Sequence, residues 1–100
     1  MGYIRHHAIA FTSYDETKIK KLHAFAISLA ESQVTPIMKS NINSYYTFFL
    51  SPDGSKEGWA DSDNGDAVRD KIIAETGDYI NFCEFYYGDD EGMSAVVRHN

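Results

Sequence analysis

The chain has 100 residues, of which 43% are hydrophobic and 14% are aromatic, and its formal net charge is -6. This length predicts a single domain, residues 1–100, with a core of its own. The negative charge excludes broad, non-specific binding of DNA or RNA, which requires clustered lysine and arginine. The net negative charge is still compatible with a small anionic ligand in one local basic pocket, because the electrostatic potential at a site is local.

The cysteine content and the hydropathy pattern predict the compartment. Cys83 is the one cysteine, so no internal disulfide can form and a reducing environment is expected. No apolar run approaches the roughly 18 residues that a membrane-spanning helix needs. The first residues also lack the apolar stretch of a signal peptide. We therefore expect a soluble protein of the cytoplasm that makes no membrane contact.

The first part of the chain is predicted to form a strand and then a helix. Residues 3–12 alternate between two faces, as a strand requires. Ser13 and Glu16 match a capping box, in which each side chain satisfies a free backbone N–H at the helix start. The helix is expected to run to about Ala30. Its buried stripe consists of Ile19, Leu22, Phe25, Ala26 and Leu29.

The middle of the chain predicts two further strands. Pro36 disfavours the helical conformation at the residue before it, and a short edge strand is expected over residues 34–39. The polar residues 41–43 favour a hairpin loop. Tyr45–Leu50, rich in aromatic residues, is the clearest strand signal of the chain.

A second helix and two final strands complete the pattern. Asp63 is expected to begin the helix, because acidic residues suit the positive end of a helix dipole. Gly77 is expected to end it. Strands are predicted over residues 79–87 and 93–98, with an acidic turn between them.

These elements follow one another in the order β-α-β-β-α-β-β. The first six match the ferredoxin-like βαββαβ pattern, in which two helices cover one face of an antiparallel sheet. The sequence therefore predicts an α+β domain with a ferredoxin-like sheet and an extra C-terminal strand. Right-handed crossovers favour placing the first strand and the Tyr45–Leu50 strand in the middle of this sheet.

The predicted strands are apolar on both faces. Phe48 and Leu50 point to one side of their strand, whereas Phe49 points to the other. A second apolar face is either covered or left as an exposed patch, and large patches usually mark an interface. We expect a homo-oligomer, most simply a two-fold dimer through the face that the helices leave open. The alternative is that the last strand and residues 52–61 fold over this face.

No catalytic or metal-binding pattern of high specificity is present. His6 and His7 are adjacent in a strand and point to opposite faces. The segment that begins at Asp61 lacks the glycine and the glutamate that an EF-hand requires. Cys83 has no basic partner, and the acidic turn 89–91 is expected to be a solvated hairpin tip rather than a cation site. The sequence thus predicts no catalytic residue, no metal and no cofactor.

A candidate ligand site lies in the loop 52–66. Lys56 and Trp59 offer a positive charge and a stacking surface, which a nucleotide-like ligand needs. Arginine suits bidentate contact with phosphate. The other predicted ligand-binding residues are Arg5, His7, Arg69 and Arg98. The alternative is that Trp59 only anchors the loop to the core.

Three segments together resemble a family of small, uncharacterised phage and prophage proteins. They are residues 5–9 (RHHAI), the loop 52–66 (PDGSKEGW, then SD and GD) and residues 87–90 (YGDD). The resemblance implies an accessory protein in the cytoplasm of an infected host and supplies no catalytic residue. It also implies action by binding, as is common among phage proteins of this size.

Binding is therefore expected rather than catalysis. The leading expectation is an anti-defence protein, a homo-oligomer that sequesters a small nucleotide-type signal of the host. The first alternative is an inhibitor of a host protein, which would use the acidic surface against a basic partner. The second alternative is a nucleotide-cleaving enzyme, for which the sequence offers no pairing of base and nucleophile.

Overall fold

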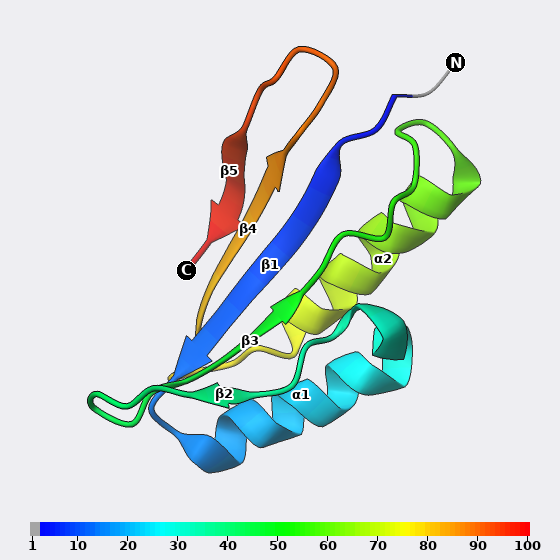
Figure 1. The fold of residues 1–100 in the computed structure, drawn as a ribbon. Helices are drawn as coiled ribbons and strands as arrows, with labels where there is room; N and C mark the ends of the chain where they lie inside the picture. The colour runs from blue at the N-terminus through cyan, green and yellow to red at the C-terminus, as the bar shows by residue number, and fades with distance from the viewer. Residues whose placement is uncertain (1–2) are drawn as a thin grey trace.

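The structure is a computed structural model that describes residues 3–100. A five-stranded antiparallel sheet carries two helices on one of its faces (Figure 1). The α+β class predicted from the sequence is confirmed. The strands are β1 (His6–Ser13), β2 (Met38–Lys39), β3 (Tyr46–Leu50), β4 (Asn81–Tyr87) and β5 (Ala95–His99), and the helices are α1 (Glu16–Ala30), the short 3-10 helix η1 (Glu31–Gln33) and α2 (Ala60–Ala74).

β1 is the central strand of the sheet, whose order is β2-β3-β1-β4-β5. It pairs with β3 on one side, with Ile9 opposite Leu50, and with β4 on the other, with Ala8 opposite Phe85. β5 extends the sheet beyond β4, and the two-residue β2 forms the opposite edge. With this fifth strand and so short a β2, the sheet departs from the standard four-stranded ferredoxin-like arrangement.

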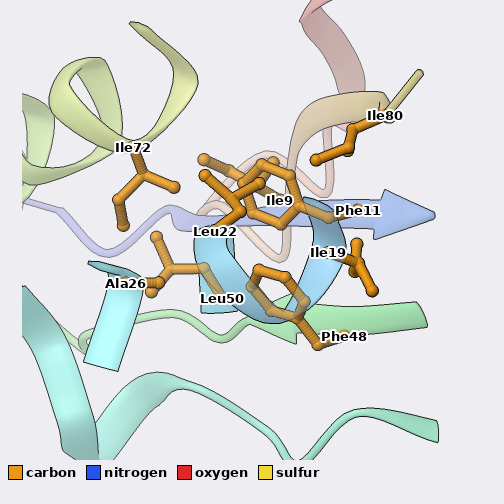
Figure 2. Packing of buried hydrophobic residues seen from close by; sticks show 9 residues of the cluster. All are labelled: Ile9, Phe11, Ile19, Leu22, Ala26, Phe48, Leu50, Ile72 and Ile80. Carbon is orange, nitrogen blue, oxygen red and sulfur yellow. The ribbon is translucent and has the colours of Figure 1, made fainter. Parts of the chain in front are cut away.

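The core lies between the helices and the sheet (Figure 2). Phe11 of β1 stacks on Phe48 of β3, with ring centroids 4.8 Å apart, and Ile72 of α2 joins the same cluster. Burying one large apolar side chain contributes about 1.5–3 kcal/mol, so this cluster holds both helices on one face. Its buried members are Ile9, Phe11, Ile19, Leu22, Ala26, Phe48, Leu50, Ile72 and Ile80.

The predicted capping box at the start of α1 is wrong. Asp15 is the N-cap, because its Oδ1 accepts the backbone N–H of Lys18 at 3.0 Å. Ser13 still belongs to β1, where its hydroxyl donates to the carbonyl of Tyr79 and accepts the N–H of Asp15. The helix therefore begins two residues later than the motif suggested, although it ends at Ala30 as predicted.

Two other predicted boundaries are also wrong. α2 begins at Ala60 rather than at Asp63, because Gly58, with φ of 82°, turns the chain just before it. Of the strand predicted over 34–39, Met38–Lys39 forms the strand β2 and Val34 makes an isolated bridge to Leu50. The proline between them cannot donate to the ladder.

The sheet face opposite the helices is not covered by any part of residues 3–100 (Figure 1). β5 lies beside β4 in the sheet, and the loop that follows β3 bridges to Ile4 through Lys56. We call this surface the open face. The strand register assigns to it His6, Ala8, Ala10, Thr12, Met38, Thr47, Phe49, Asn81, Cys83, Phe85, Tyr87, Val96 and His99. None of these residues is an aspartate, glutamate, lysine or arginine.

Candidate functional site

Three of the predicted ligand-binding residues come together on the α2 side of the sheet. His7 from β1, Arg69 from α2 and Arg98 from β5 line one cavity of about 350 Å³. We call this cavity the arginine cleft. Its other lining residues are Asp66, Asp70, Glu84 and Val97.

Glu84 of β4 holds both arginines of the cleft. Its Oε1 accepts a hydrogen bond from Arg98 Nε, and its Oε2 lies 3.4 Å from Arg69 Nε. The side chains of Glu84 and Arg69 are only 5% and 4% exposed. Burial acts to lower the pKa of Arg98, but its hydrogen bonds to Glu84 and Asp70 outweigh that effect and raise its pKa. A buried carboxylate of this kind is stable only because it is paired.

Exposed aspartates occupy the outer nitrogens of the same two arginines. Arg69 Nη2 pairs with Asp66, one turn earlier on α2, and Arg98 Nη2 lies 2.6 Å from Asp70 Oδ1. The side chains of Asp66 and Asp70 are 58% and 64% exposed. The Arg98–Asp70 pair is exposed at both ends, and such pairs contribute about 0–1 kcal/mol. In the Arg69–Asp66 pair only the carboxylate is exposed.

A bulge in β5 brings Arg98 into the cleft. Glu84 lies opposite Arg98, but the next residue, Phe85, lies opposite Val96, so Val97 is an extra residue. Strict alternation would have put Arg98 on the same face as Val96, which is the open face. The bulge instead turns Val97 and Arg98 to the same side as α2.

His7 ties the cleft to the loop that precedes α2. Its Nε2 lies 2.6 Å from Glu57 Oε1, and the hydroxyl of Ser62 donates to the other oxygen of Glu57 at 3.5 Å. His7 Nδ1 is buried and has no hydrogen-bond partner within residues 3–100. The contact with Glu57 therefore fixes the loop against β1 and leaves one ring nitrogen of His7 unsatisfied.

The loop also packs directly on α2 at Gly65. A Cβ atom at this position would collide with the carboxylate of Asp53. Burial acts to raise the pKa of Asp53, but hydrogen bonds from the hydroxyl and the N–H of Ser55 outweigh that effect, so the pKa lies below its ordinary value.

A second cavity of about 350 Å³ lies between this loop and α2 and is lined by Asp53 and Gly65 among others. No lysine or arginine lines this cavity, so it is not suited to an anion.

Lys56 and Trp59 lie together at the end of this loop, outside both cavities. Lys56 Nζ is 5.2 Å from the centroid of the Trp59 ring. Trp59 is 52% exposed, so it does not anchor the loop in the core. Lys56 has no ion pair in the part of the chain that the structure describes.

Arg5 lies apart from the other predicted residues. Its Nη2 is 3.2 Å from Asp89 Oδ2, and its guanidinium lies over the ring of Tyr86, 4.2 Å from the centroid. It lines a separate cavity of about 250 Å³ with Tyr3 and the acidic residues 89–91. The carboxylates around it neutralise this arginine as well.

Sequence reasoning did not identify the carboxylates that organise the cleft. Glu84 did carry a signal, because it is the one charged residue of β4 (NFCEFYY) and a charge inside an apolar strand requires a partner. Asp66 and Asp70 carried no such signal in the sequence, since acidic residues on an exposed helix face are common. Among residues 3–100, no set of three or more histidine, cysteine or acidic side chains is placed to hold a metal ion.

Two further findings concern the chain as a whole. No helix within residues 3–100 has the length and apolar character needed to cross a membrane. Comparisons with protein-family models, with curated proteins and with solved structures find no match for this chain. The six predicted ligand-binding residues therefore remain a prediction.

Proposed function

We propose that this protein acts by binding a small nucleotide-type anion in the arginine cleft and that it is not an enzyme. The observation that carries the proposal is the shared carboxylate of Glu84, which fixes two guanidinium groups from different elements side by side. One buried negative charge between two positive charges leaves one positive charge in excess. Asp66 and Asp70, the two exposed aspartates, bring the whole cluster to a net charge of -1, and they are the groups that a ligand would displace.

One phosphate group can replace both aspartates. An arginine–aspartate contact and an arginine–phosphate contact are charge-assisted hydrogen bonds of the same kind, and the Arg98–Asp70 pair, exposed at both ends, contributes about 0–1 kcal/mol. A phosphate group can accept from Arg69 Nη2 and Arg98 Nη2 together, and His7 lines the same cavity. A single phosphate-bearing ligand can therefore take the place of Asp66 and Asp70 at the pair.

The test is a titration by calorimetry and thermal shift against a panel of linear and cyclic nucleotides. Asp70→Asn removes the competing carboxylate, so we expect it to tighten binding about two- to fivefold. Arg98→Gln removes a charged donor and should weaken binding at least tenfold. Asp63→Asn, which makes the same charge change on α2 outside the cleft, is the control and should have no effect beyond that of net charge.

Two outcomes would contradict the proposal. One is the absence of any shift in melting temperature across the whole panel, since a ligand that binds only the folded state must raise it. The other is weaker binding by Asp70→Asn, which would mean that the aspartate itself contacts the ligand. Appearance of a cleaved nucleotide during the incubation would instead support the nucleotide-cleaving alternative.

The second candidate function is inhibition of a host protein. The observation that favours it is the acidity of the surface around the cleft, where Asp61, Asp63, Asp66 and Asp70 follow one another along α2 and the turn 89–91 is acidic. Such a surface suits a basic partner. Capture of one host protein in the absence of any nucleotide effect would favour this function over the first.

We also propose a homodimer through the open face. The eight residues of β1 give the face a length of about 26 Å, and five strands give it a width of about 24 Å. Because the other four strands are shorter than β1, the planar area is only about 430 Å² per partner, the size of a weak interface. The lack of charged residues on the face removes repulsion between two copies of an acidic chain.

The biological setting is a proposal of the same kind. The resemblance of residues 5–9, 52–66 and 87–90 to phage and prophage proteins supports an anti-defence role in the cytoplasm of an infected host. The strands β4-β1-β3-β2 with two helices on one face support a divergent ferredoxin-like unit to which β5 was added. Expression of the chain in a host that carries a nucleotide-signalling defence would test the role directly.

A further inference from the structure

We propose a second binding site at the opposite end of the sheet, for a planar aromatic anion that also carries an N–H donor, such as a nucleoside monophosphate. The site is a cavity of about 450 Å³ between α1 and the connection from α2 to β4. It shares no residue with the arginine cleft. The proposal is therefore independent of the proposed function.

The shape and lining of the cavity suit a small ligand. Its volume lies in the usual range of about 300–1,000 Å³ for ligand pockets. Leu22 and Phe25 of α1, with Ile80 before β4, form an apolar floor. Lys18 and Lys21 lie on the same wall, one turn of α1 apart. An apolar floor beneath two cations favours a ligand with a flat apolar ring and an anionic group.

These two lysines are available to a ligand, unlike the arginines of the cleft. Neither Lys18 nor Lys21 forms an ion pair with a carboxylate of residues 3–100. Their neighbour Lys20 does, since its Nζ lies 2.9 Å from Glu16 Oε2. Lys18 Nζ is instead held 4.5 Å from the centroid of the ring of Tyr79, which lies between the lining residues Asp78 and Ile80 in the chain.

Tyr79 is placed beside the cavity at a conformational cost. Its φ of 70° lies in the left-handed region, which is unfavourable for an aromatic residue. The hydroxyl of Ser13 holds its carbonyl at 2.5 Å, and the ring of Tyr14 meets its ring edge-on at 6.1 Å. Its side chain is nevertheless 60% exposed. Strained residues of this kind cluster at ligand sites, and the strain here presents a flat ring to solvent.

The strain is confined to this end of the molecule. The only other non-glycine residues of positive φ in residues 3–100 are Asn43 and Ser44, in the hairpin between β2 and β3. The residue after that hairpin, Tyr45, also contacts Tyr14, with ring centroids 6.3 Å apart. The hairpin and the connection to β4 lie at the same end of the sheet in Figure 1. Two strained loops thus present the exposed tyrosines Tyr45 and Tyr79 at this end of the sheet.

Charge also distinguishes this end. Two lysines and two carboxylates line the cavity, so its charged residues have no net charge, whereas the whole chain carries -6. An anion therefore meets less repulsion at this cavity than the net charge of the chain implies.

The carboxylates of the cavity refine the ligand. Glu75 and Asp78 line it, and neither forms an ion pair within the described chain. A carboxylate accepts hydrogen bonds only, so it favours a ligand with an N–H donor. An aminopurine or aminopyrimidine ring offers that donor and a stacking face, and its phosphate suits Lys18 and Lys21.

The test is a calorimetric titration of the intact protein with AMP, with adenosine and inorganic phosphate as separate probes. We expect AMP to bind at least tenfold more tightly than either part. Lys21→Gln should weaken AMP binding about tenfold, whereas Lys20→Gln, the same charge change outside the cavity, should change it less than twofold. Tyr79→Gly should weaken binding and still fold, because glycine adopts positive φ readily and the bond from Ser13 is to the backbone.

Three results would overturn the proposal. They are equal effects of Lys21→Gln and Lys20→Gln, binding of AMP no tighter than that of inorganic phosphate, and unchanged affinity in a folded Tyr79→Gly variant. Arg98→Gln separates the two sites: a loss of affinity in that variant but not in Lys21→Gln would assign AMP to the arginine cleft and remove it from this cavity.

Discussion

Asp89 illustrates how strongly one side chain depends on its neighbours. The backbone N–H of Met93, 2.7 Å from Asp89 Oδ1, holds the pKa of Asp89 below its ordinary value, with help from Arg5 and the N–H of Glu91. The side chain is only 4% exposed. The turn between β4 and β5 is therefore stabilised by a carboxylate that must be ionised.

This lowered pKa predicts a pH dependence of stability. A carboxyl group whose pKa is lower in the folded than in the unfolded chain stabilises the fold above its unfolded pKa of about 4, and the contribution is lost as the pH falls through the folded pKa. Asp89→Asn should thus be less stable than the wild type at pH 7, and the difference should shrink as the pH falls below about 4. Denaturant unfolding at a series of pH values measures it.

Asp90→Asn is the control for this prediction. It makes the same charge change in the same turn, but Asp90 accepts none of the hydrogen bonds that Asp89 accepts. An equal loss of stability in both variants would show that the charge of the turn, rather than the contacts of Asp89, is responsible.

Single residues of the cleft were predictable only in part. Arg69 and Arg98 were recognised as candidate anion contacts from their chemistry, and the structure does bring them together with His7. Their carboxylate partners were not foreseen, because Glu84 is far from both arginines in the sequence and meets Arg98 only through a register shift. Local pattern does not encode such a shift.

At the scale of elements, the existence of helices and strands was easier to predict than their ends. The stripe at Ile19, Leu22 and Ala26 is buried as expected. Ser13 and Asp15 both have side chains that can cap a helix, and the sequence alone does not distinguish them. The hydrogen bond from Ser13 to Tyr79, a tertiary contact, decides the choice.

The cap of α1 gives a prediction at this scale. Asp15→Ala should destabilise the fold by about 1 kcal/mol, because the N–H of Lys18 loses its acceptor. Asp15→Ser, which retains a capping oxygen, should recover most of that loss. Chemical denaturation of the three proteins measures both changes. A full loss in Asp15→Ser would mean that the charge at the helix end, and not the cap, supplies the stability.

At the scale of the whole molecule, the two faces of the sheet are chemically different. The helices bury one face, and the open face is free of charged residues. This division was predictable from the alternation within strands. The position of the loop 51–59 was not predictable from the sequence, because it depends on the close approach of Asp53 to Gly65 on the α2 side of the sheet. The alternative prediction, in which this loop and the last strand fold over the open face, is wrong: the loop packs on α2, and β5 lies beside β4 in the sheet.

The proposed dimer is tested with two neighbouring valines of the edge strand. Val96 is on the open face and Val97 on the α2 side, and both are about half exposed, at 58% and 49%. We expect the wild type to have the mass of two chains by light scattering at micromolar concentration. Val96→Lys should give the mass of one chain, because it places a charge in the interface. Val97→Lys should leave the dimer intact.

A wild-type chain that scatters as a single copy would remove the dimer through the open face. Equal dissociation by both lysine variants would indicate instead that two copies pair along the outer edge of β5, where either lysine would interfere.

The bulge in β5 has a consequence for how this chain has to be aligned with any relatives. Removal of Val97 would leave a regular ladder in which Phe85 still meets Val96 and Glu84 still meets Arg98. A deletion of one residue at this point is therefore compatible with the same ion pair, and chains of 99 and 100 residues can share one site. An alignment that admits no gap there would shift the arginine of the shorter chain by one column and hide the correspondence.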